Sequence, residues 1–171
     1  MRKLTFTFVP IFLITLLTCL FLLSPNVVMS ETVKYEDLVT RKGLYYQKSS
    51  DGPFTGKTTG KVQASFKNGK KEGPWVGYHE NGQLRYKITY KNGKKEGPWV
   101  GFYKNGQLRR KGNFKNGKWD GPFVSYYKNG QVISKGTFKN GKKEGPWVYY
   151  RLDGPVDEQR TGTYKNGVKV K

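Results

Sequence analysis

The sequence predicts an all-β protein in which tandem β-hairpin repeats form one extended, twisted antiparallel sheet. The first observation behind this prediction is a period. A lysine-rich phrase, "FKNGKKEGPW" or a close variant, opens on an aromatic residue that recurs every 24 residues, and "KNG" returns once more after a spacing of 26. These aromatic residues are Phe66, Tyr90, Phe114, Phe138 and Tyr164. A fixed period of this length is typical of stacked supersecondary units, each of which depends on its neighbours for burial.

The second observation is a pair of turn signals in each repeat. One signal is "KNGKKEG", and the other is "NGQ", which follows Glu80, Lys104 and Lys128. Asn-Gly suits the left-handed backbone of a tight hairpin turn, because glycine has no side chain to clash and asparagine tolerates that region. The stretches between the signals are about six to eight residues long and rich in Trp, Tyr, Phe, Val and Thr, as strands are. Each repeat is therefore predicted to be one β-hairpin.

A two-residue turn at Asn81 and Gly82 would fix the register of the first hairpin, whereas one extra turn residue would flip the second strand to the other face. With the two-residue turn, the predicted pairs are Trp75 with Ile88, Gly77 with Tyr86, and His79 with Leu84. The same rule pairs Trp99 with Gly112 and Phe123 with Gly136, so a large ring is expected over each of these glycines. The structural positions of the repeat are Trp75, Trp99, Phe123, Trp147, Gly82, Gly106 and Gly130.

Side-chain alternation predicts two chemically different faces of the sheet. One face collects an aromatic and aliphatic ladder: Leu84, Tyr90, Leu108, Phe114, Val132 and Phe138. The other face collects basic residues beside apolar ones: Arg85, Lys87, Arg109, Lys111 and Lys135 with Val76, Tyr78 and Phe102. Arg85, Lys87, Arg109 and Lys111 form a candidate binding surface, which we name the basic face.

Residues 1–30 are typical of an export signal. Arg2 and Lys3 precede an uncharged apolar run, Leu4–Leu23, and cleavage is expected after the small Ser30. The run is long enough to span a bilayer, so an uncleaved anchor is the alternative. In both cases the positive amino end stays cytoplasmic, and we expect the body to be exported, either periplasmic or secreted. Apolar residues continue after Cys19, which argues against a lipoprotein signal.

The rest of the chain divides into three parts. Residues 31–65 contain an aromatic stretch and a degenerate "GPF", and we expect a divergent capping hairpin there. Residues 66–163 hold four tandem hairpin repeats of 24–26 residues, and residues 164–171 supply a final polar strand. An open array of repeats needs such end units to cover its exposed faces.

The body carries a large positive charge. Thirty-two Lys and Arg, two of them in the leader, stand against twelve Asp and Glu, so residues 31–171 have a net charge of about +18. A field of this sign gathers polyanions: nucleic acid, anionic lipid, acidic polysaccharide or an acidic protein. Since export separates the body from nucleic acid, we expect a protein partner or an anionic envelope surface, and neither nucleic acid nor a small-molecule substrate.

Stacked hairpins would align the lysines that follow each "KNG" along one edge of the sheet. This lysine row comprises Lys70, Lys71, Lys94, Lys95, Lys118, Lys142 and Lys143. Attraction to anionic lipid is worth about 1 kcal/mol per basic residue near the surface, so a few engaged lysines would give measurable binding. The alternative is that these lysines belong to solvated turns and discourage edge-to-edge aggregation of an open sheet.

No constellation of residues in the sequence points to catalysis, and we expect neither an enzyme nor a cofactor. His79 is the only histidine, and other residue types take its place in the other repeats. Each repeat carries one carboxylate at the same loop position: Glu72, Glu96, Asp120 and Glu144. We expect these carboxylates to accept backbone N–H bonds within each loop, because an acid–base pair needs two of them at close range in different environments.

A metal site is not expected either. Asp153, Asp157 and Glu158 lie in an insertion that lacks the ligand spacing of a cation-binding loop, so a solvated insertion is the favoured interpretation. Cys19 is the only cysteine and lies in the leader, so the body contains no thiol for a disulfide or a thiolate ligand.

The repeat "G-x-W-x-x-Y/F-x-x-N-G-Q-L-x-x-x-G-x-F-K-N-G-K-x-x-G" resembles the MORN repeat in its bacterial variant form, and "GLYYQKSSDGPFTG" is similar to the opening of YwqK-type repeat proteins. The resemblance covers roughly residues 36–171 and implies a MORN-like solenoid of hairpins. The YwqK-type family is often labelled an antitoxin component, and MORN proteins are associated with membrane attachment and protein scaffolding. Export does not suit a cytoplasmic antitoxin, and the insertion from Leu152 breaks the last period.

Two functions are therefore expected as alternatives. The first is a non-enzymatic interaction module of the cell envelope, which holds an anionic surface or an acidic protein through its lysine row and aromatic face. The second, implied by the resemblance alone, is a YwqK-type antitoxin that neutralises a dedicated toxin protein.

Overall fold

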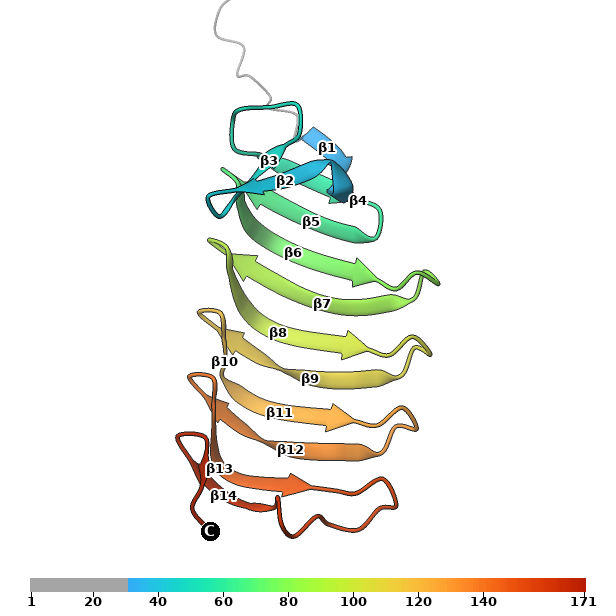
Figure 1. Ribbon diagram of the computed structural model, residues 1–171, viewed down its shortest axis with the longest axis vertical. Helices are drawn as coiled ribbons and strands as arrows, with labels where there is room; N and C mark the ends of the chain where they lie inside the picture. The colour runs from blue at the N-terminus through green and yellow to red at the C-terminus, as the bar shows by residue number, and fades with distance from the viewer. Residues whose placement is uncertain (1–30) are drawn as a thin grey trace, which may run out of the picture.

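The computed structural model describes residues 31–171, which form one long sheet of tandem hairpins (Figure 1). The main sheet has 13 strands and a second, separate sheet has two. Among the described residues the only helical element is a single 3-10 turn, η1 (Tyr35–Asp37). The predicted all-β solenoid is confirmed. The predicted export signal lies outside the described residues.

The strands follow the chain in order across the sheet, and nearly all neighbouring strands are antiparallel. The strands are β1 (Glu31–Lys34), β2 (Leu38–Arg41), β3 (Leu44–Gln47), β4 (Gly56–Thr59), β5 (Val62–Lys67), β6 (Lys70–Tyr78), β7 (Leu84–Lys91), β8 (Lys94–Phe102), β9 (Leu108–Lys115), β10 (Lys118–Trp119), β11 (Gly121–Tyr126), β12 (Val132–Lys139), β13 (Lys142–Tyr149), β14 (Gly162–Lys165) and β15 (Val168–Lys169). From β5 to β13 each strand pairs with its predecessor, except that the short β10 pairs only with β9 and β11 takes the next place.

The "KNG" turns are two-residue turns with both central residues in the left-handed region. At the β7–β8 turn, for example, φ is +51° at Asn92 and +79° at Gly93. This is the backbone of a type I′ turn, whose twist matches that of the flanking strands. All of these turns lie on one side of the sheet, on the left in Figure 1, as the period predicts.

The "NGQ" turns on the opposite side differ from the two-residue turn that the sequence predicted. His79 N donates to Gln83 O at 2.8 Å and Gly82 N donates to His79 O at 3.0 Å, which makes a longer turn. The extra residue is absorbed by a bulge after Gly77, and Tyr78 rather than His79 pairs with Leu84. The predicted His79–Leu84 pair is therefore wrong. The predicted ladder is also wrong at its aliphatic positions: Leu84 pairs with Tyr78, Leu108 with Phe102 and Val132 with Tyr126, and cross-strand partners share a face, so these three residues lie opposite the aromatic face. The bulge also explains why the rest of the register survives, since it restores the alternation before β7 continues.

The predicted pairs beyond the bulge are confirmed: Trp75 with Ile88, Gly77 with Tyr86, Trp99 with Gly112, and Phe123 with Gly136. At Gly136 and Gly112, however, the nearest ring is not that of the cross-strand partner. A Cβ placed at Gly136 would meet the ring of Trp147, 2.3 Å away, rather than Phe123. At Gly112 the nearest ring belongs to Trp119, with Phe123 behind it. Gly136 and Gly112 thus admit rings from the next repeat, whereas the space beside Gly77 is filled by the ring of its own partner, Tyr86.

The N-terminal part, residues 31–65, is more elaborate than a hairpin. β1 pairs with β4 in the only parallel arrangement among the described strands, and β2 and β3 form the small second sheet. Figure 1 shows β2 and β3 crossing in front of the first strands of the main sheet. Tyr45 of β3 lies 4.9 Å, centroid to centroid, from the ring of Phe66, so this small sheet covers the start of the aromatic ladder.

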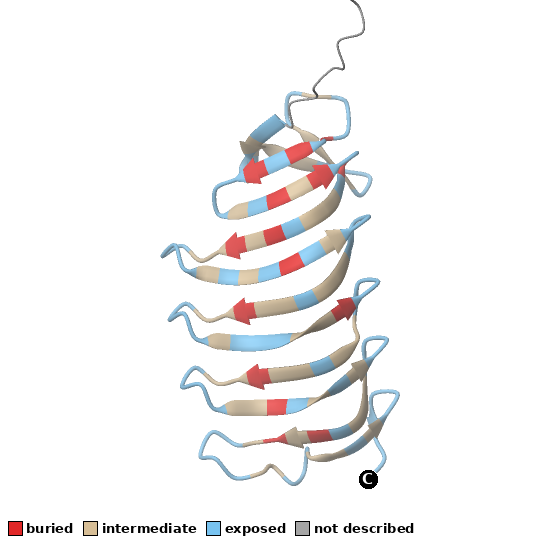
Figure 2. Cartoon of the chain, turned by 180° about the vertical axis from the view of Figure 1, so that it is seen from behind, coloured by how far each residue is buried: buried red, intermediate tan, exposed pale blue. Residues whose placement is uncertain are grey.

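Buried positions recur on successive strands along the solenoid (Figure 2), and most of the buried apolar side chains are aromatic. The main cluster contains Phe54, Ala64, Phe66, Trp75, Ile88 and Phe114, and Trp147 is the most buried side chain, at 2% exposure. Ring contacts join neighbouring strands along the array, as between Trp75 of β6 and Tyr90 of β7 at 5.1 Å and between Phe138 of β12 and Trp147 of β13 at 4.9 Å. The aromatic face is thus mainly the protein's own core.

At the C-terminal end, the sheet closes with β14 and β15 after the insertion at residues 151–161. Tyr150, just before this insertion, and Val156 within it form an isolated bridge. None of residues 31–171 belongs to a helix long and apolar enough to cross a membrane.

Candidate functional site

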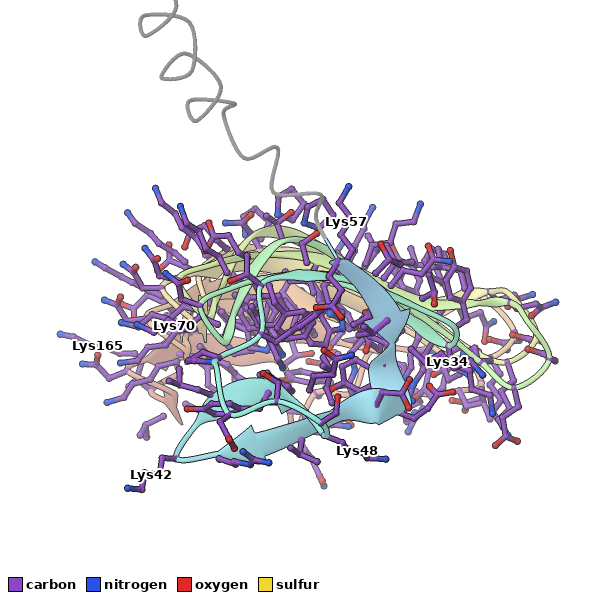
Figure 3. All side chains as sticks on the ribbon, turned by 90° about the horizontal axis from the view of Figure 1, so that it is seen from above. Lys34, Lys42, Lys48, Lys57, Lys70 and Lys165 are labelled. Atoms are coloured by element: carbon purple, nitrogen blue, oxygen red, sulfur yellow. The ribbon has the colours of Figure 1, made fainter. Side chains whose placement is uncertain are left out.

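The main candidate site is a band of exposed lysines at the side of the sheet that carries the "KNG" turns. A lysine stands on each side of these turns, and the two lysines face each other across the hairpin. We define the lysine edge by these eight exposed residues: Lys67, Lys70, Lys91, Lys94, Lys115, Lys118, Lys139 and Lys142. In Figure 3, which looks along the solenoid, Lys70 and Lys165 lie on the same side although they belong to opposite ends of the array.

The lysine edge places like charges directly opposite each other in every hairpin. Lys91 pairs with Lys94 and Lys139 pairs with Lys142, for example. Like charges at facing positions destabilise a β-ladder. Successive turns are two strands apart, or about 9.5 Å, which is comparable to the Debye length at 0.1 M salt. The edge is therefore a closely spaced cationic line that the fold itself does not require.

In the described part of the chain, the carboxylates beside the lysine edge bind backbone N–H groups and form no ion pairs with its lysines. Each accepts a hydrogen bond from the backbone N–H of the turn asparagine one repeat later: Glu72 from Asn92 at 2.6 Å, Glu96 from Asn116 at 2.9 Å, Asp120 from Asn140 at 3.0 Å and Glu144 from Asn166 at 3.0 Å. The predicted backbone acceptor role is confirmed, but the bonds join consecutive repeats instead of closing one loop. Within residues 31–171 the ion pairs are Arg41–Asp51 and Arg151–Asp153, and neither involves the edge.

The predicted lysine row separates into two groups. Lys70, Lys94, Lys118 and Lys142 are exposed on the lysine edge, whereas the second lysine of each pair is half-buried against aromatic rings. Lys71 Nζ lies 4.1 Å from the centroid of the Trp75 ring, and Lys95 Nζ lies 4.8 Å from that of Phe114. Lys143 Nζ lies within 5.2 Å of the rings of Trp147, Tyr149 and Tyr164. These inner lysines belong to the aromatic face.

Burial acts on the inner lysines. It lowers the pKa of Lys95 from its ordinary value, and the positive charge of Lys71 lowers it further. Both causes disfavour the ammonium form, while the Phe114 ring attracts it. Trp119 takes the place of this lysine in the third repeat, where its ring packs on that of Phe114 with the centroids 3.9 Å apart.

A groove of about 640 Å³ lies along the middle of the lysine edge. Its walls come from three successive turns: Lys94, Lys115, Asn116, Lys118, Asp120, Lys139 and Asn140. Since Asp120 already binds the turn backbone, the groove presents mainly ammonium groups.

The basic face is assembled as the sequence predicts for its lysines but not for its arginines. Lys87, Lys111 and Lys135 stand in one row across the strands, and each is flanked by valines of the neighbouring strands. Arg85 and Arg109 lie at the bulges near the "NGQ" turns, with the guanidinium carbon 5.9 Å from the Tyr86 ring and 5.8 Å from the Tyr103 ring, respectively. The bulge turns them away from the lysine row: Arg85 lines a pocket with Gly77 and Tyr86, and Arg109 lines one with Ser125 and Trp147 of the aromatic face. The lysine edge and this row of three lysines therefore carry charge in two separate lines.

His79 has a structural counterpart in each of the next two repeats. His79 Nε2 donates to the carbonyl oxygen of Phe102 at 3.0 Å, Tyr103 Oη donates to Tyr126 O at 2.7 Å, and Tyr127 Oη donates to Tyr150 O at 3.0 Å. The acceptor lies 23 residues later in each case. His79 is thus one of three side chains that tie an "NGQ" turn to the following repeat.

Over residues 31–171, no three His, Cys, Asp or Glu side chains gather into a group that could hold a metal ion. Asp153 pairs with Arg151 at 3.5 Å, and Asp157 Oδ1 accepts a bond from the backbone N–H of Arg160 at 3.1 Å.

The sequence analysis missed a hollow of about 400 Å³ on the aromatic face. Ser125 and Ser134 lie in it, and Arg160 of the insertion contributes to its wall. A signal was present in the sequence: at the positions of Gly77 and Tyr86 in the first repeat, the third repeat carries two serines. Such a departure from the repeat pattern, at positions that face the aromatic side, indicates a local change in packing.

The comparisons with known proteins identify the repeats. Residues 71–92, 95–116 and 119–140 match the family model described as MORN repeat variant, a description that mentions neither YwqK nor an antitoxin. The search of curated proteins found no match. One similar solved structure is described as "Crystal structure of GtfA/B complex bound to UDP and GlcNAc", with 10% identity and a TM-score of 0.23. That similarity covers 80% of this chain and 27% of the other, and it carries no argument at so low a TM-score.

Proposed function

Residues 71–140 comprise three MORN repeat variants, a kind of repeat that typically mediates protein interactions, and from this premise we propose that the protein is a non-enzymatic interaction module of the cell envelope. The lysine edge holds an anionic surface, either the lipid headgroups of a membrane or an acidic envelope polysaccharide. An acidic protein with a flat or linear array of carboxylates would engage the same residues.

The proposal rests on one observation: in successive hairpins, two lysines lie directly opposite each other. Four hairpins place two ammonium groups opposite each other, and the carboxylates of the same repeats bind backbone N–H groups instead. Protection from edge-to-edge aggregation would need charges on the two outermost strands of the sheet. The lysine edge instead runs across the ends of inner strands, so the anti-aggregation explanation does not account for it.

The expected energetics support a surface-binding role. Each basic residue near an anionic membrane contributes about 1 kcal/mol, so three or four engaged lysines would give an easily measured affinity. Such binding is electrostatic and must weaken with salt, since the Debye length falls from about 30 Å at 0.01 M to about 10 Å at 0.1 M.

The proposal is tested by co-sedimentation with phosphatidylglycerol-containing vesicles, with pure phosphatidylcholine vesicles as the matched control. An insoluble acidic polysaccharide such as cross-linked polygalacturonate is assayed in parallel. We expect retention on at least one of the anionic supports at low salt and release when salt is added. Absence of retention on both at low salt, or equal retention on phosphatidylcholine, would overturn the proposal.

The antitoxin alternative makes a different prediction. A YwqK-type antitoxin would bind one toxic protein, so co-expression with a toxin encoded beside it would rescue growth. Cell fractionation with mass measurement of the mature chain separates the two functions further, because an envelope module must be found outside the cytoplasm, with or without its leader.

A further inference from the structure

One row of side chains across the aromatic face alternates between small and large residues, and the alternation fails at one place. In strand order, the row is Gly77, Tyr86, Gly101, Arg110, Ser125, Ser134 and Tyr149. In the first repeat the large residue fills the space above the small one: a Cβ at Gly77 would lie 2.4 Å from the Tyr86 ring. Ser125 and Ser134 are two small residues in succession. The hollow of about 400 Å³ lies over them.

The floor of the hollow is polar. Ser125 Oγ and Ser134 Oγ are 2.7 Å apart and share a hydrogen bond, with only 6% and 5% of the two residues exposed. Two hydroxyl groups have two protons, and their mutual bond uses one of them. The pair therefore retains one O–H donor and free acceptor lone pairs for a ligand above it.

The walls of the hollow are aromatic and cationic. Rings of Phe123, Phe138 and Tyr149 line it, and so do four cations, those of Arg109, Arg110, Lys143 and Arg160. The Arg160 guanidinium lies 4.3 Å from the centroid of the Tyr149 ring, and Lys143 Nζ lies 4.9 Å from the same ring. No Asp or Glu is among the residues that line the hollow. Its charge therefore complements an anion, and its size falls within the range of small-ligand sites.

We propose that this hollow binds an acidic sugar unit. The C–H face of a pyranose packs on the aromatic rings, its hydroxyl groups bond to the serine pair, and its carboxylate or phosphate meets the arginines and Lys143. A simple inorganic anion would use the cations but leave the rings without a partner. An apolar ligand would leave the serine pair and four cations without partners, which costs free energy.

This inference goes beyond the proposed function, because none of the eight residues of the lysine edge lines the hollow. A protein with both sites would bind an acidic glycan in two ways: the lysine edge would contact the length of the polymer, and the hollow would bind a single sugar unit. Either site can fail without the other.

The test measures binding of glucuronate, glucose 6-phosphate and glucose to the purified protein by NMR titration. Glucuronate represents a carboxylated sugar, the phosphate ester represents a phosphorylated one, and glucose is the neutral control. For ligands of this size a Kd of about 1 mM is expected. At least one acidic sugar should bind at least tenfold more tightly than glucose, and the tighter of the two identifies the anionic group.

Two variants locate the binding. Ser125→Gly combined with Ser134→Tyr restores the glycine–tyrosine pair of the first repeat, so the chain should fold while a ring fills the hollow; binding should be lost. Arg160→Gln should weaken acidic sugars at least threefold and leave glucose unchanged. Lys111→Gln removes one charge from the opposite face and should change nothing.

The proposal is overturned if neither acidic sugar binds at concentrations up to about 10 mM, tenfold above the expected Kd. It is also overturned if glucose binds equally well, or if the filled double variant folds and retains binding. A variant with glutamine at Lys94, Lys118 and Lys142 keeps the two proposals apart, since it should lose anionic vesicles and still bind the sugar.

Discussion

The Glu72 carboxylate accepts a hydrogen bond from the backbone N–H of Asn92, 20 residues later and one repeat further along the sheet, at 2.6 Å. The next residue, Gly93, donates its own N–H to the carbonyl oxygen of Lys71 at 2.8 Å. The type I′ turn leaves both N–H groups pointing at the preceding repeat. Sequence repetition therefore becomes a ladder of identical bonds, and this ladder holds the lysine-bearing turns in line.

Removing one carboxylate from this ladder should destabilise the protein locally. Glu96→Ala leaves the N–H of Asn116 without its charged acceptor, and we expect a loss of about 1 kcal/mol in the free energy of unfolding. Glu80→Ala, which removes an exposed carboxylate from an "NGQ" turn, is the control. Urea denaturation measures both. Equal stability of the two variants would show that the ladder contributes nothing.

The glycine at the centre of each hairpin should resist substitution because a ring occupies its side-chain space. Gly136→Ala drives a Cβ to within 2.3 Å of the Trp147 ring, and such overpacking costs about 1–3 kcal/mol. At Gly52 the only heavy atom near a new Cβ is Ser50 Oγ at 3.8 Å, so Gly52→Ala should be tolerated. Thermal unfolding measures the stability of the two variants. A Gly136→Ala protein as stable as Gly52→Ala would mean that the ring does not lie there.

Alkaline pH should destabilise the N-terminal end through its tyrosines. Burial, together with the neighbouring Tyr86 and Tyr45, raises the pKa of Tyr90 above its ordinary value of 10.0, and burial likewise raises the pKa of Tyr35. Above about pH 10 the unfolded chain loses these phenolic protons while the folded chain retains them, so stability falls as pH rises through the folded pKa. The lowered pKa of Lys95 has the opposite effect on stability, because the folded chain loses this proton at a lower pH than the unfolded chain does.

Tyr90→Phe should flatten this alkaline loss, because the variant has no phenol to ionise. Free energies of unfolding measured at about pH 8 and about pH 11 give the slope. Tyr78→Phe, on the basic face, is the control and should follow the parent protein. A Tyr90→Phe slope as steep as that of the parent would exclude Tyr90 as a source of the loss.

The role of His79 can be tested by replacing it with the residue that two other repeats carry at this position. Tyrosine occupies the equivalent position twice, and its hydroxyl reaches a carbonyl of the next repeat there as His79 Nε2 does here. His79→Tyr should therefore keep the stability of the protein, whereas His79→Ala should lose about 1 kcal/mol with the hydrogen bond. If His79→Tyr were as unstable as His79→Ala, the equivalence would be incorrect.

The sequence predicts most of the fold because period and turn chemistry agree in each repeat. Asn92 and Gly93 require a type I′ turn, and 24-residue spacing then aligns the hairpins. The "NGQ" turns were harder: Asn81 is not in the left-handed region, and the bulge after Gly77 followed from a longer turn that Asn-Gly alone does not specify. The parallel β1 was not predictable from local patterns, since its partner β4 lies 25 residues away.

The candidate site was predicted only in part, for a reason of geometry. Lys70 and Lys71 are consecutive in the strand, so alternation sends their side chains to opposite sides, one outward at the edge and one onto the Trp75 ring. The predicted lysine row placed both residues on the same edge and so did not take this alternation into account. The hollow depends on Arg160, whose position is set by the irregular insertion and not by the repeat.

The most direct test of the central claim compares two variants of equal net charge. One carries glutamine at Lys94, Lys118 and Lys142 of the lysine edge; the other carries glutamine at Lys87, Lys111 and Lys135 on the basic side of the sheet. Binding to phosphatidylglycerol vesicles at low salt should fall at least tenfold in the first variant, since three lysines contribute about 1 kcal/mol each, and should stay near that of the parent in the second. Equal losses in the two variants, or a greater loss in the second, would contradict the assignment of binding to the lysine edge.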